Sequence, residues 1–247
     1  MPQPGVKSLQ KIKVVLIGSN GLLGSDLSKT LRVNENIDLI PLNKKQCDVT
    51  NYKDVKKNLG KLNFDYLINA AAFAQVDLAE VEKDTCYLVN VQAVKNLIRI
   101  SKKKNATIIH FSSDYVFDGK NNQPYQEDDL RLPLSVYGNS KKESEDIVTS
   151  YRKHYVLRTS WLFGKAKNNF VSKIKEKSEE SITLTVVNDQ IGSPTYTIDI
   201  GIFVGEIISK NIKEYGIYNI TNEGFMSWYE FAKLILKLLN RKLEVNP

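Results

Sequence analysis

The most constraining feature of this sequence is a glycine-rich turn between an apolar run and an amphipathic segment. Residues 11–17 read KIKVVLI, a β-branched run that predicts a strand, and residues 22–31 carry apolar side chains at helical spacing. Between them, GSNGLLG places a glycine at 18, 21 and 24. Glycine lets the backbone turn tightly and approach a pyrophosphate, whose charge the first amides of the helix can hold. Strand, turn and helix in this order predict a dinucleotide site that includes Gly18, Asn20, Gly21, Leu22, Leu23 and Gly24.

The segments that follow alternate between short apolar runs and stretches with helical spacing. The runs at 37–42, 64–69, 107–111 and 155–158 predict strands, and residues 135–151 predict a surface-packed helix. Such alternation is typical of the α/β class and predicts a Rossmann-type, doubly wound parallel sheet with helices on both faces. We expect the run at 155–158 to complete the sheet.

Beyond residue 160 the pattern becomes less regular. Helices are predicted at 170–177, 198–208 and 227–239, and strands at 182–187 and 217–220. These elements predict a smaller C-terminal α/β lobe that lies against the carboxyl edge of the sheet. The expected organisation is therefore a cofactor-binding domain that carries the catalytic residues at 11–160, an interleaved substrate lobe at 161–247 and a flexible tail at 1–10.

Composition and charge narrow the classes of protein. No apolar run approaches the roughly 18 residues of a membrane span, and the first residues do not resemble a signal peptide, so we expect a cytoplasmic protein. Cys47 and Cys86 lie far apart without a CxxC pattern, which predicts buried structural thiols and no metal site. The net charge of +7 suits a phosphate-bearing small molecule. The sequence contains no basic patch with interleaved aromatic residues, the pattern that would favour nucleic-acid binding.

The residues after the second predicted strand bear on the choice of cofactor. That strand ends in Leu42, and Asn43, Lys44 and Lys45 follow, without the carboxylate that would bind the ribose hydroxyls of NAD. The lysines can instead neutralise a 2′-phosphate, which favours NADPH over NADH, although a merely solvated loop explains them too. Farther on, Asp48 and Val49 are placed to flank an adenine.

Tyr137 and Lys141 are candidate catalytic residues because they lie four apart near the start of a predicted helix. A neighbouring ammonium is expected to lower the pKa of the phenol, which could then deliver a proton to a developing alkoxide. Ser113 and Asp114 follow the strand at 107–111, at the edge where open α/β sheets bind their ligands. Ser113 could hold a substrate carbonyl there, or the segment could be an ordinary capped loop. His110 is interpreted as a core histidine.

Six segments taken in order carry a family resemblance: GSNGLLG, NAAAFAQVD, HFSSDYVFDG, VYGNSK, RTSWLFG and NDQIGSPT. From about Ile12 onward the chain resembles the extended short-chain dehydrogenase/reductases and, among them, the dTDP-4-dehydrorhamnose reductase family. The resemblance implies an NAD(P)H-dependent oxidoreductase that reduces the 4-keto group of a dTDP-4-dehydro-6-deoxy sugar to give dTDP-L-rhamnose. It also implies a dTDP-sugar as the small-molecule partner and allows a homodimer.

The resemblance assigns roles to individual positions. Ser113 would polarise the carbonyl, Tyr137 would donate the proton, and Lys141 would orient the nicotinamide ribose. The cofactor cleft would also be lined by Ala70, Ala71, Ala72 and Ala74, the last standing where some relatives have a hydroxyl. The substrate cleft would include Val76, Ser113, Asp114, Tyr137, Trp161, Asn169, Gln190 and Pro194.

Two alternatives remain open at this point. The regulatory β subunit of methionine adenosyltransferase resembles the same family and acts by binding a partner enzyme. A combined epimerase/reductase is the nearer alternative, but its loop carries a cysteine for proton abstraction, whereas this chain has Ser113, Asp114 and Tyr115 there. Family members also continue past the position of Pro247 with a segment rich in Arg, Pro and Asn. We therefore expect a shortened substrate lobe.

Overall fold

A computed structural model describes residues 10–166, 169–180 and 182–247. Its centre is a six-stranded sheet in the order β10-β5-β4-β3-β1-β2, in which every neighbouring pair is parallel. This arrangement confirms the predicted α/β, Rossmann-type fold. The strands are β1 (Ile12–Ile17), β2 (Ile37–Leu42), β3 (Tyr66–Asn69), β4 (Thr107–Ser113), β5 (His154–Thr159) and β10 (Gly216–Asn219).

The prediction that the sheet ends with the strand at 155–158 is wrong. β10, expected in the small lobe, pairs with β5 as a sixth strand, with Ile217 opposite Val156 and Tyr218 opposite Leu157. The added strand covers the hydrogen-bonding edge of β5 and lets Tyr218 pack against the same apolar cluster as Tyr155. β10 is therefore the edge strand on this side, and a late segment of the chain completes the sheet.

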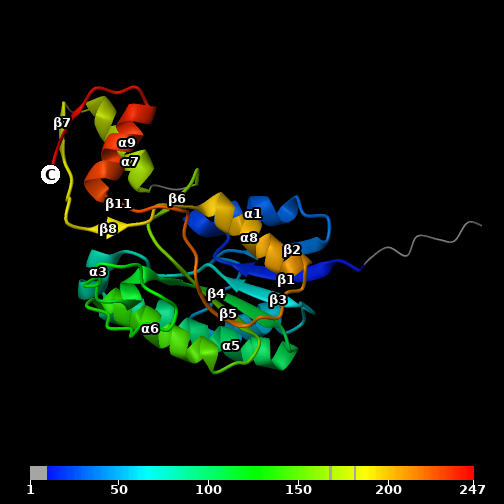
Figure 1. The fold of residues 1–247 in the computed structure, drawn as a ribbon. Coiled ribbons are helices and arrows are strands. Elements are labelled where there is room, and N and C mark those ends of the chain that lie inside the picture. Colours follow the sequence, from blue (N-terminus) through cyan, green and yellow to red (C-terminus); the bar gives the residue numbers. More distant parts are fainter. Residues whose placement is uncertain (1–9, 167–168, 181) are drawn as a thin grey trace, which may run out of the picture.

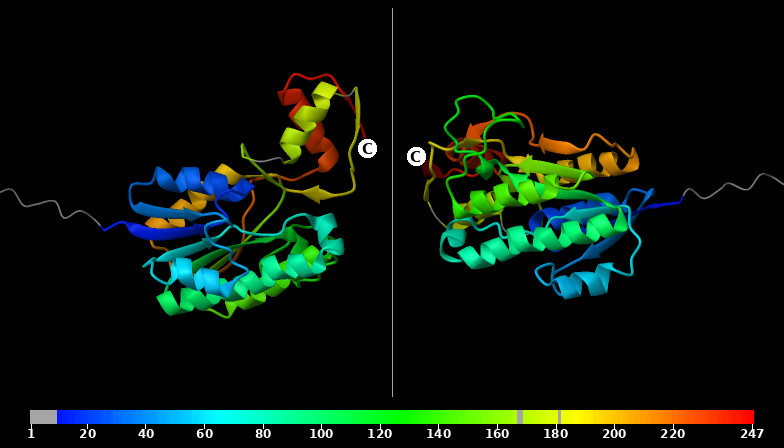
Figure 2. Two further views of the ribbon diagram at one scale, coloured as in Figure 1. Left: turned by 180° about the vertical axis from the view of Figure 1, so that it is seen from behind. Right: turned by 90° about the horizontal axis from the view of Figure 1, so that it is seen from below.

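Two helical layers enclose the sheet (Figures 1 and 2). On one face α1 (Leu22–Arg32) and α8 (Thr197–Ser209) pack together, and on the other lie α2 (Tyr52–Leu59), α5 (Ala93–Lys104) and α6 (Val136–Thr149). Each layer buries its own apolar cluster against one side of the strands. Buried faces on both sides explain why the strands read as continuous apolar runs.

Helix α8 also joins the C-terminal part of the chain to the start of the cofactor domain. The Thr197 hydroxyl donates to the fully buried Asp26 carboxylate of α1 at 2.6 Å. At the other end of the helix, the Asn34 amide donates to the Ser209 hydroxyl at 2.8 Å. The chain therefore returns to the sheet after it has formed part of the small lobe.

Short helical segments fill the space between β3 and α5 and follow β4. They are α3 (Val76–Val81), α4 (Lys83–Tyr87), the π-helical turn η1 (Leu88–Gln92) and the 3₁₀ turn η2 (Asp114–Val116). Through α3 and α4 the chain packs against α6, the helix that carries Tyr137 and Lys141.

The small lobe stands above the carboxyl edge of the sheet (Figure 1). Its core lies between helices α7 (Phe170–Glu180) and α9 (Trp228–Leu238) and includes Ile174, Phe231 and Leu236. Short strand pairs surround it: β7 (Thr183–Thr185) with β12 (Glu244–Asn246), β8 (Ile191–Gly192) with β11 (Met226–Ser227), and β6 (Leu162–Phe163) with β9 (Thr195–Tyr196).

Two further expectations concern the N-terminal tail and membrane-spanning helices. The expected tail at 1–10 lies, apart from Gln10, outside the described residues. Within the described ranges no helix combines the length and the apolar character needed to cross a bilayer.

Candidate active site

The glycine turn follows β1, the strand that lies between β3 and β2 in the sheet. The strand order changes direction at this point. Gly18 has a φ of +80°, and a Cβ atom there would lie 2.6 Å from the backbone nitrogen of Ala71. Only glycine therefore lets the turn approach the residues that follow β3. The amides of Gly18 and Ser19 both donate to the Leu42 carbonyl, which ties the turn to the end of β2. The predicted cofactor residues after β1 and β3 thus meet at the carboxyl edge.

Helix α1 begins directly after this turn with its amino end suited to an anion. Gly21 is the N-cap and offers no side-chain hydrogen bond, and the first turn contains no acidic residue. The first amides of a helix lack intrahelical partners and lie at the positive end of its dipole. A phosphate is the ligand that such an end holds best.

The end of β2 places an exposed lysine beside the glycine turn. The Asn43 side chain accepts from the amides of Lys45 and Gln46, which fixes the turn in which the exposed Lys44 stands. Asp48 accepts from the Thr50 amide at 3.0 Å and from its hydroxyl at 2.7 Å. The Thr50 hydrogen bonds lower the pKa of the Asp48 carboxyl, whereas desolvation opposes them. Asp48 is therefore ionised at neutral pH.

Ser113 and Tyr137 come together at the carboxyl end of β4. The strand runs two residues farther than predicted, so Ser113 is its last residue rather than part of a loop. Its hydroxyl donates to the Asp114 carboxylate at 2.8 Å. Tyr137 is the second residue of α6, whose N-cap Ser135 accepts from the Gly138 amide at 3.0 Å. A strand end and a helix start thus hold the two hydroxyl groups.

The Tyr137 phenol is buried, and burial raises its pKa well above that of a free tyrosine. A hydrogen bond with Ser113 acts in the opposite direction, while the charge of Asp114 adds to the increase. Lys141 is not among the causes, so the prediction that its ammonium lowers this pKa is wrong for this structure. The reason is desolvation, which penalises the phenolate. The phenol consequently keeps its proton at neutral pH.

Lys141 lies one turn farther along α6 and is 2% exposed. Its ammonium donates to the Phe111 carbonyl of β4 at 2.6 Å. Burial lowers the pKa of Lys141 to about 8, although the charge of Glu145 acts in the opposite direction. Since an ordinary lysine has a pKa of roughly 10.4, this ammonium loses its proton in a mildly alkaline range.

Asp114 adds a third titratable group beside the two hydroxyls. Burial raises the pKa of its carboxyl to about 6, and the hydrogen bond from Ser113 opposes that change. The ring of the next residue, Tyr115, meets the Tyr137 ring edge-on at 5.6 Å between centroids. The group is therefore packed as well as hydrogen-bonded.

His110 is held as a core histidine, as the sequence analysis interprets it. Its ring contacts the Asn69 amide at 3.0 Å and the Ser144 hydroxyl at 3.1 Å, and it is 1% exposed. Desolvation and the charge of Lys141 lower its pKa well below the ordinary value. The ring is therefore neutral and belongs to the support of α6.

Sequence reasoning missed Asn90, which braces the active-site helix. Asn90 lies in the π-helical turn η1, and its side chain accepts from the Phe73 amide and donates to the Phe73 carbonyl. Its amide also donates to the Ser140 hydroxyl at 2.9 Å, and Ser140 in turn donates to the Tyr137 carbonyl. The available signal was a buried polar residue inside the apolar segment LVNVQ.

Both cysteines are buried and unpaired thiols. Burial raises the pKa of Cys47 to about 11, and the nearby Asp54 and Asp48 carboxylates add to this increase. The Cys86 thiol donates to the Ser140 hydroxyl at 3.4 Å. In the described part of the chain, neither belongs to a group of three or more His, Cys, Asp or Glu residues that could hold a metal ion.

The predicted substrate residues fall into two groups. Val76 begins α3 and contacts the apolar cluster of Tyr137, so it lies with Ser113 and Asp114. The second group comes from the small lobe and the segment that leads to it. It comprises Trp161, Asn169, Gln190 and Pro194.

Trp161 has a left-handed backbone, with φ of 45°, and stacks on Trp228 at 3.5 Å between ring centroids. A Cβ atom on Gly192 would lie 2.4 Å from the indole, so glycine is required there. Trp228 and Gln190 both line a cavity of about 320 Å³ in the small lobe. The indole of Trp161 thus connects the end of β5 with that lobe.

Asn169 and Pro194 lie where the structure shows packing and hydrogen bonds within the protein. The Asn169 side chain donates to the Gly164 carbonyl at 2.8 Å and accepts from the Val171 amide at the start of α7. Pro194 follows Ser193, whose carbonyl accepts from the Ser160 hydroxyl at 2.7 Å. Asn169 therefore holds the start of α7, and Ser193, the neighbour of Pro194, ties the small lobe to the segment after β5.

A Rossmann-type sheet with a glycine turn at its strand-order change and a Ser–Tyr–Lys group at the end of its fourth strand defines a short-chain dehydrogenase/reductase. Comparison with known proteins narrows this class. Residues 12–247 match the family model described as RmlD substrate binding domain. The chain belongs to the dTDP-4-dehydrorhamnose reductase family.

Individual relatives agree with this assignment. A dTDP-4-dehydrorhamnose reductase of Aggregatibacter actinomycetemcomitans is 40% identical over 89% of this chain and 76% of its own length. The spore coat polysaccharide biosynthesis protein SpsK of Bacillus subtilis is 38% identical over 91% of this chain and 78% of its own. A crystal structure of dTDP-4-dehydrorhamnose reductase from Bacillus anthracis in complex with NADP superposes with a TM-score of 0.93. It shares 37% identity and covers 96% of this chain and 84% of that one.

Proposed function

We propose that the chain is an NADPH-dependent reductase that converts dTDP-4-dehydrorhamnose to dTDP-L-rhamnose, the last step of dTDP-rhamnose biosynthesis. The observation that carries this proposal is the Ser113, Tyr137 and Lys141 group at the end of β4 in a member of this family. The relative named for spore coat polysaccharide biosynthesis suggests a use of the product in surface polysaccharide.

The residues at the glycine turn fit a dinucleotide cofactor. Gly18 approaches Ala70 and Ala71 too closely for any side chain, and the uncapped start of α1 suits a pyrophosphate. The exposed Lys44 at the end of β2 suits a 2′-phosphate and favours NADPH, with NADH still possible. The relative from Bacillus anthracis was solved with NADP. The proposed cofactor residues are Gly18, Asn20, Gly21, Leu22, Leu23, Gly24, Asn43, Lys44, Asp48, Val49, Ala70, Ala71, Ala72, Ala74, Tyr137 and Lys141.

The chemistry divides between the cofactor and the chain. When bound, reduced nicotinamide supplies the hydride for the C4 carbonyl. Tyr137 supplies the proton to the oxygen, and the C4 carbonyl becomes a hydroxyl while the phenol becomes a phenolate. The Ser113 hydroxyl turns from Asp114 and donates its one proton as a hydrogen bond to the carbonyl oxygen, on which negative charge develops. Solvent then returns a proton to Tyr137.

Burial affects the protonation of both Tyr137 and Lys141 in this step. Burial raises the pKa of the Tyr137 phenol, so the proton is present when the alkoxide forms. The Lys141 ammonium, one helical turn away, holds the ribose of the nicotinamide. Because burial lowers the pKa of Lys141 to about 8, we expect activity to fall as pH rises through this range.

The substrate is proposed to lie between the carboxyl edge of the sheet and the small lobe, which is built from the parts of residues 161–247 other than α8 and β10. Asp114 and Val76 would contact the sugar beside the reacting carbon. Trp161, Asn169, Gln190 and Pro194 would contact the nucleotide or its diphosphate. The stacked indoles of Trp161 and Trp228 offer an apolar wall for a ring, and the cavity next to Gln190 lies in the same lobe.

The names of the relatives favour reduction over the regulatory alternative. Absence of a thiol at Ser113, Asp114 and Tyr115 supports reduction without epimerisation. We further propose that the chain acts in the cytoplasm on this small molecule rather than on nucleic acid, and that it forms a homodimer. Its mass in solution, measured by light scattering, tests the dimer.

The proposed function is tested by adding freshly epimerised dTDP-4-dehydrorhamnose to the purified chain with NADPH. Loss of the reduced-nicotinamide absorbance, together with formation of dTDP-rhamnose, is the expected result. A chain that binds NADPH tightly but oxidises none with this substrate would overturn the proposal.

A further inference from the structure

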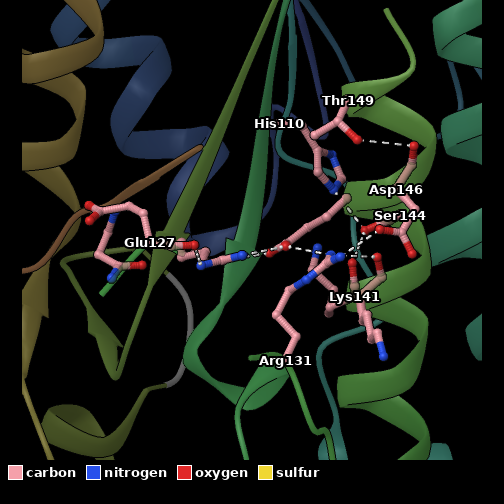
Figure 3. A network of polar contacts seen from close by, with 11 residues as sticks. His110, Glu127, Arg131, Lys141, Ser144, Asp146 and Thr149 are labelled. Carbon is pink, nitrogen blue, oxygen red and sulfur yellow. Dashed lines mark hydrogen bonds and ion pairs between the residues drawn. The ribbon is translucent and has the colours of Figure 1, made fainter. Parts of the chain in front are cut away.

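Helix α6 carries a buried carboxylate one turn beyond Lys141. Tyr137, Lys141 and Glu145 are spaced by four residues and so share one face of the helix. The Glu145 side chain is 0% exposed. Figure 3 shows the surrounding network, with Lys141, Ser144 and Asp146 on the helix and Arg131 beside it.

Two arginines hold this carboxylate in one position. Arg158 of β5 donates through Nε to Oε1 at 2.9 Å and through Nη2 to Oε2 at 2.8 Å. Arg131, from the segment that leads into α6, donates through Nη1 to Oε2 at 3.0 Å. A bidentate pair is geometrically specific, and Arg131 brings a second cation to the same carboxylate.

The far side of the network is fixed as well. Nη1 of Arg158 donates to the Glu127 carbonyl at 2.9 Å, and the guanidinium lies 5.0 Å from the centre of the Phe117 ring. Arg131 also pairs with the more exposed Asp146 at 2.7 Å. The desolvation cost of a buried ion pair can exceed the attraction between its charges, so stability alone does not explain this one.

The groups that face Lys141 from each packed element identify its counter-charge. From α6 come Tyr137 and Glu145, from β4 comes His110, and from α4 comes the Cys86 thiol. Burial keeps the phenol protonated and the imidazole neutral. Within the described part of the chain, the ammonium donates to the Phe111 carbonyl, which carries no net charge. Among the described residues, Glu145 is thus the carboxylate that acts on Lys141.

We propose that Glu145 is a positioning residue whose carboxylate, clamped by Arg158 and Arg131, is the buried counter-charge that keeps the Lys141 ammonium charged in the active site. The two arginines partly neutralise the carboxylate and so set how strongly it acts. The inference rests on the proposed function and deepens it, because the Lys141 ammonium is proposed to hold the cofactor ribose as a charged donor.

The test measures the charge state of Lys141 itself. Lysine labelled with ¹³C at Cε reports protonation in an NMR titration of the whole chain, and Lys141→Met assigns the signal. Glu145→Gln removes the negative charge and is expected to move the titration midpoint of Lys141 to lower pH by about one unit. The same midpoint in the wild-type chain and in Glu145→Gln would overturn the proposal.

Arg131→Gln is the second variant, with an expected change of opposite sign. Removing this partly exposed cation leaves Glu145 less neutralised, so the Lys141 midpoint moves to higher pH. If Glu145→Gln fails to fold, this variant alone decides, and an unchanged midpoint contradicts the inference. Asp146→Asn is the matched control, because it removes a neighbouring carboxylate on the same arginine and should leave the midpoint in place.

Activity supplies the second readout. In Glu145→Gln the alkaline decline of kcat should begin at lower pH, and in Arg131→Gln at higher pH. A uniform loss of kcat at every pH, with no displacement of the profile, would show a merely structural role. If the wild-type chain oxidises no NADPH while the NMR midpoints still move, the proposed function fails and the role of Glu145 remains.

Discussion

At the scale of single residues, burial sets the chemistry of the site. Tyr137 and Lys141 stand four apart on one helix face, and Ser113 ends the strand beside them. Burial raises the pKa of the phenol and lowers that of the ammonium, because neither charged form is solvated there. The phenol therefore enters the reaction as an acid.

Replacing Tyr137 by phenylalanine removes the proposed proton donor and little else. We predict a fall in kcat of about a hundredfold or more, with the dissociation constant for NADPH nearly unchanged. Steady-state rates and fluorescence titration of NADPH measure the two quantities. Tyr229→Phe, at a half-buried tyrosine of α9, is the control with normal activity. A Tyr137→Phe enzyme with the wild-type rate would contradict the assigned mechanism.

Lys44 tests the choice of cofactor. Lys44 is exposed and lies two residues after Leu42, whose carbonyl is bonded to the glycine turn, so Lys44→Ala should weaken NADPH binding by roughly tenfold through loss of a charged contact to phosphate. NADH lacks the 2′-phosphate, and its dissociation constant should hardly change. Isothermal titration of both cofactors, with the exposed Lys61→Ala as control, measures the difference. Equal effects on NADPH and NADH would exclude a 2′-phosphate contact.

The sequence could predict which residues gather at the site but not their electrostatics. Helical spacing places Tyr137 above Lys141, and the end of a parallel strand places Ser113 at the same edge. The directions of the pKa changes depend on how closely α4 and β4 pack around α6, which no local pattern encodes. For the same reason Glu145 and Arg158 read as ordinary surface charges until the fold shows them buried.

At the scale of elements, local signals define most boundaries closely. The predicted strand at 37–42 matches β2 residue for residue, and the helix predicted at 22–31 is α1 with one added residue. The end of β4 was harder to predict, because polar Ser112 and Ser113 resemble a loop although both are buried. The neighbouring strand β5 supplies their backbone partners, a long-range effect that local propensity does not contain.

Helix α9 offers a test of a local signal in the small lobe. Ser227 accepts from the Glu230 amide at 3.1 Å, and the Glu230 carboxylate accepts from the Ser227 amide at 2.8 Å, a complete capping box. Ser227→Ala should lower the free energy of unfolding by about 1–2 kcal/mol. Urea unfolding followed by circular dichroism measures the change. Ser178→Ala in α7 is the control, and equal losses in both variants would contradict a specific cap.

At the scale of the whole molecule, the chain crosses between the sheet and the small lobe more than once. It leaves the sheet after β5, builds α7 and β7–β9, returns through α8 and β10, and ends in α9 and β12. The sequence predicts the helices α7, α8 and α9 and the strands β7 and β10, but not the short strands β8, β9 and β12. It also does not indicate the partner of β10, a four-residue strand of partly buried side chains. Thr197 and Asp26, joined at 2.6 Å, fix this return to the first helix of the cofactor domain.

Because the chain crosses in this way, the proposed substrate lobe is attached to the sheet that carries the proposed catalytic group. Trp161 directly extends the end of β5, and its indole stacks on Trp228 of the small lobe. The carboxyl edge of the sheet is thereby connected to the lobe through few, well-packed residues. A nucleotide sugar bound by the lobe would present its sugar to Ser113 and Tyr137.

Isotope transfer tests the central claim most directly. NADPH that carries deuterium on the transferred position at C4 of the nicotinamide is incubated with the chain and dTDP-4-dehydrorhamnose, and the sugar product is examined by NMR. We predict dTDP-L-rhamnose with deuterium at C4 of the sugar. A product without deuterium at that carbon, or no product when both molecules are shown to bind, would contradict the account.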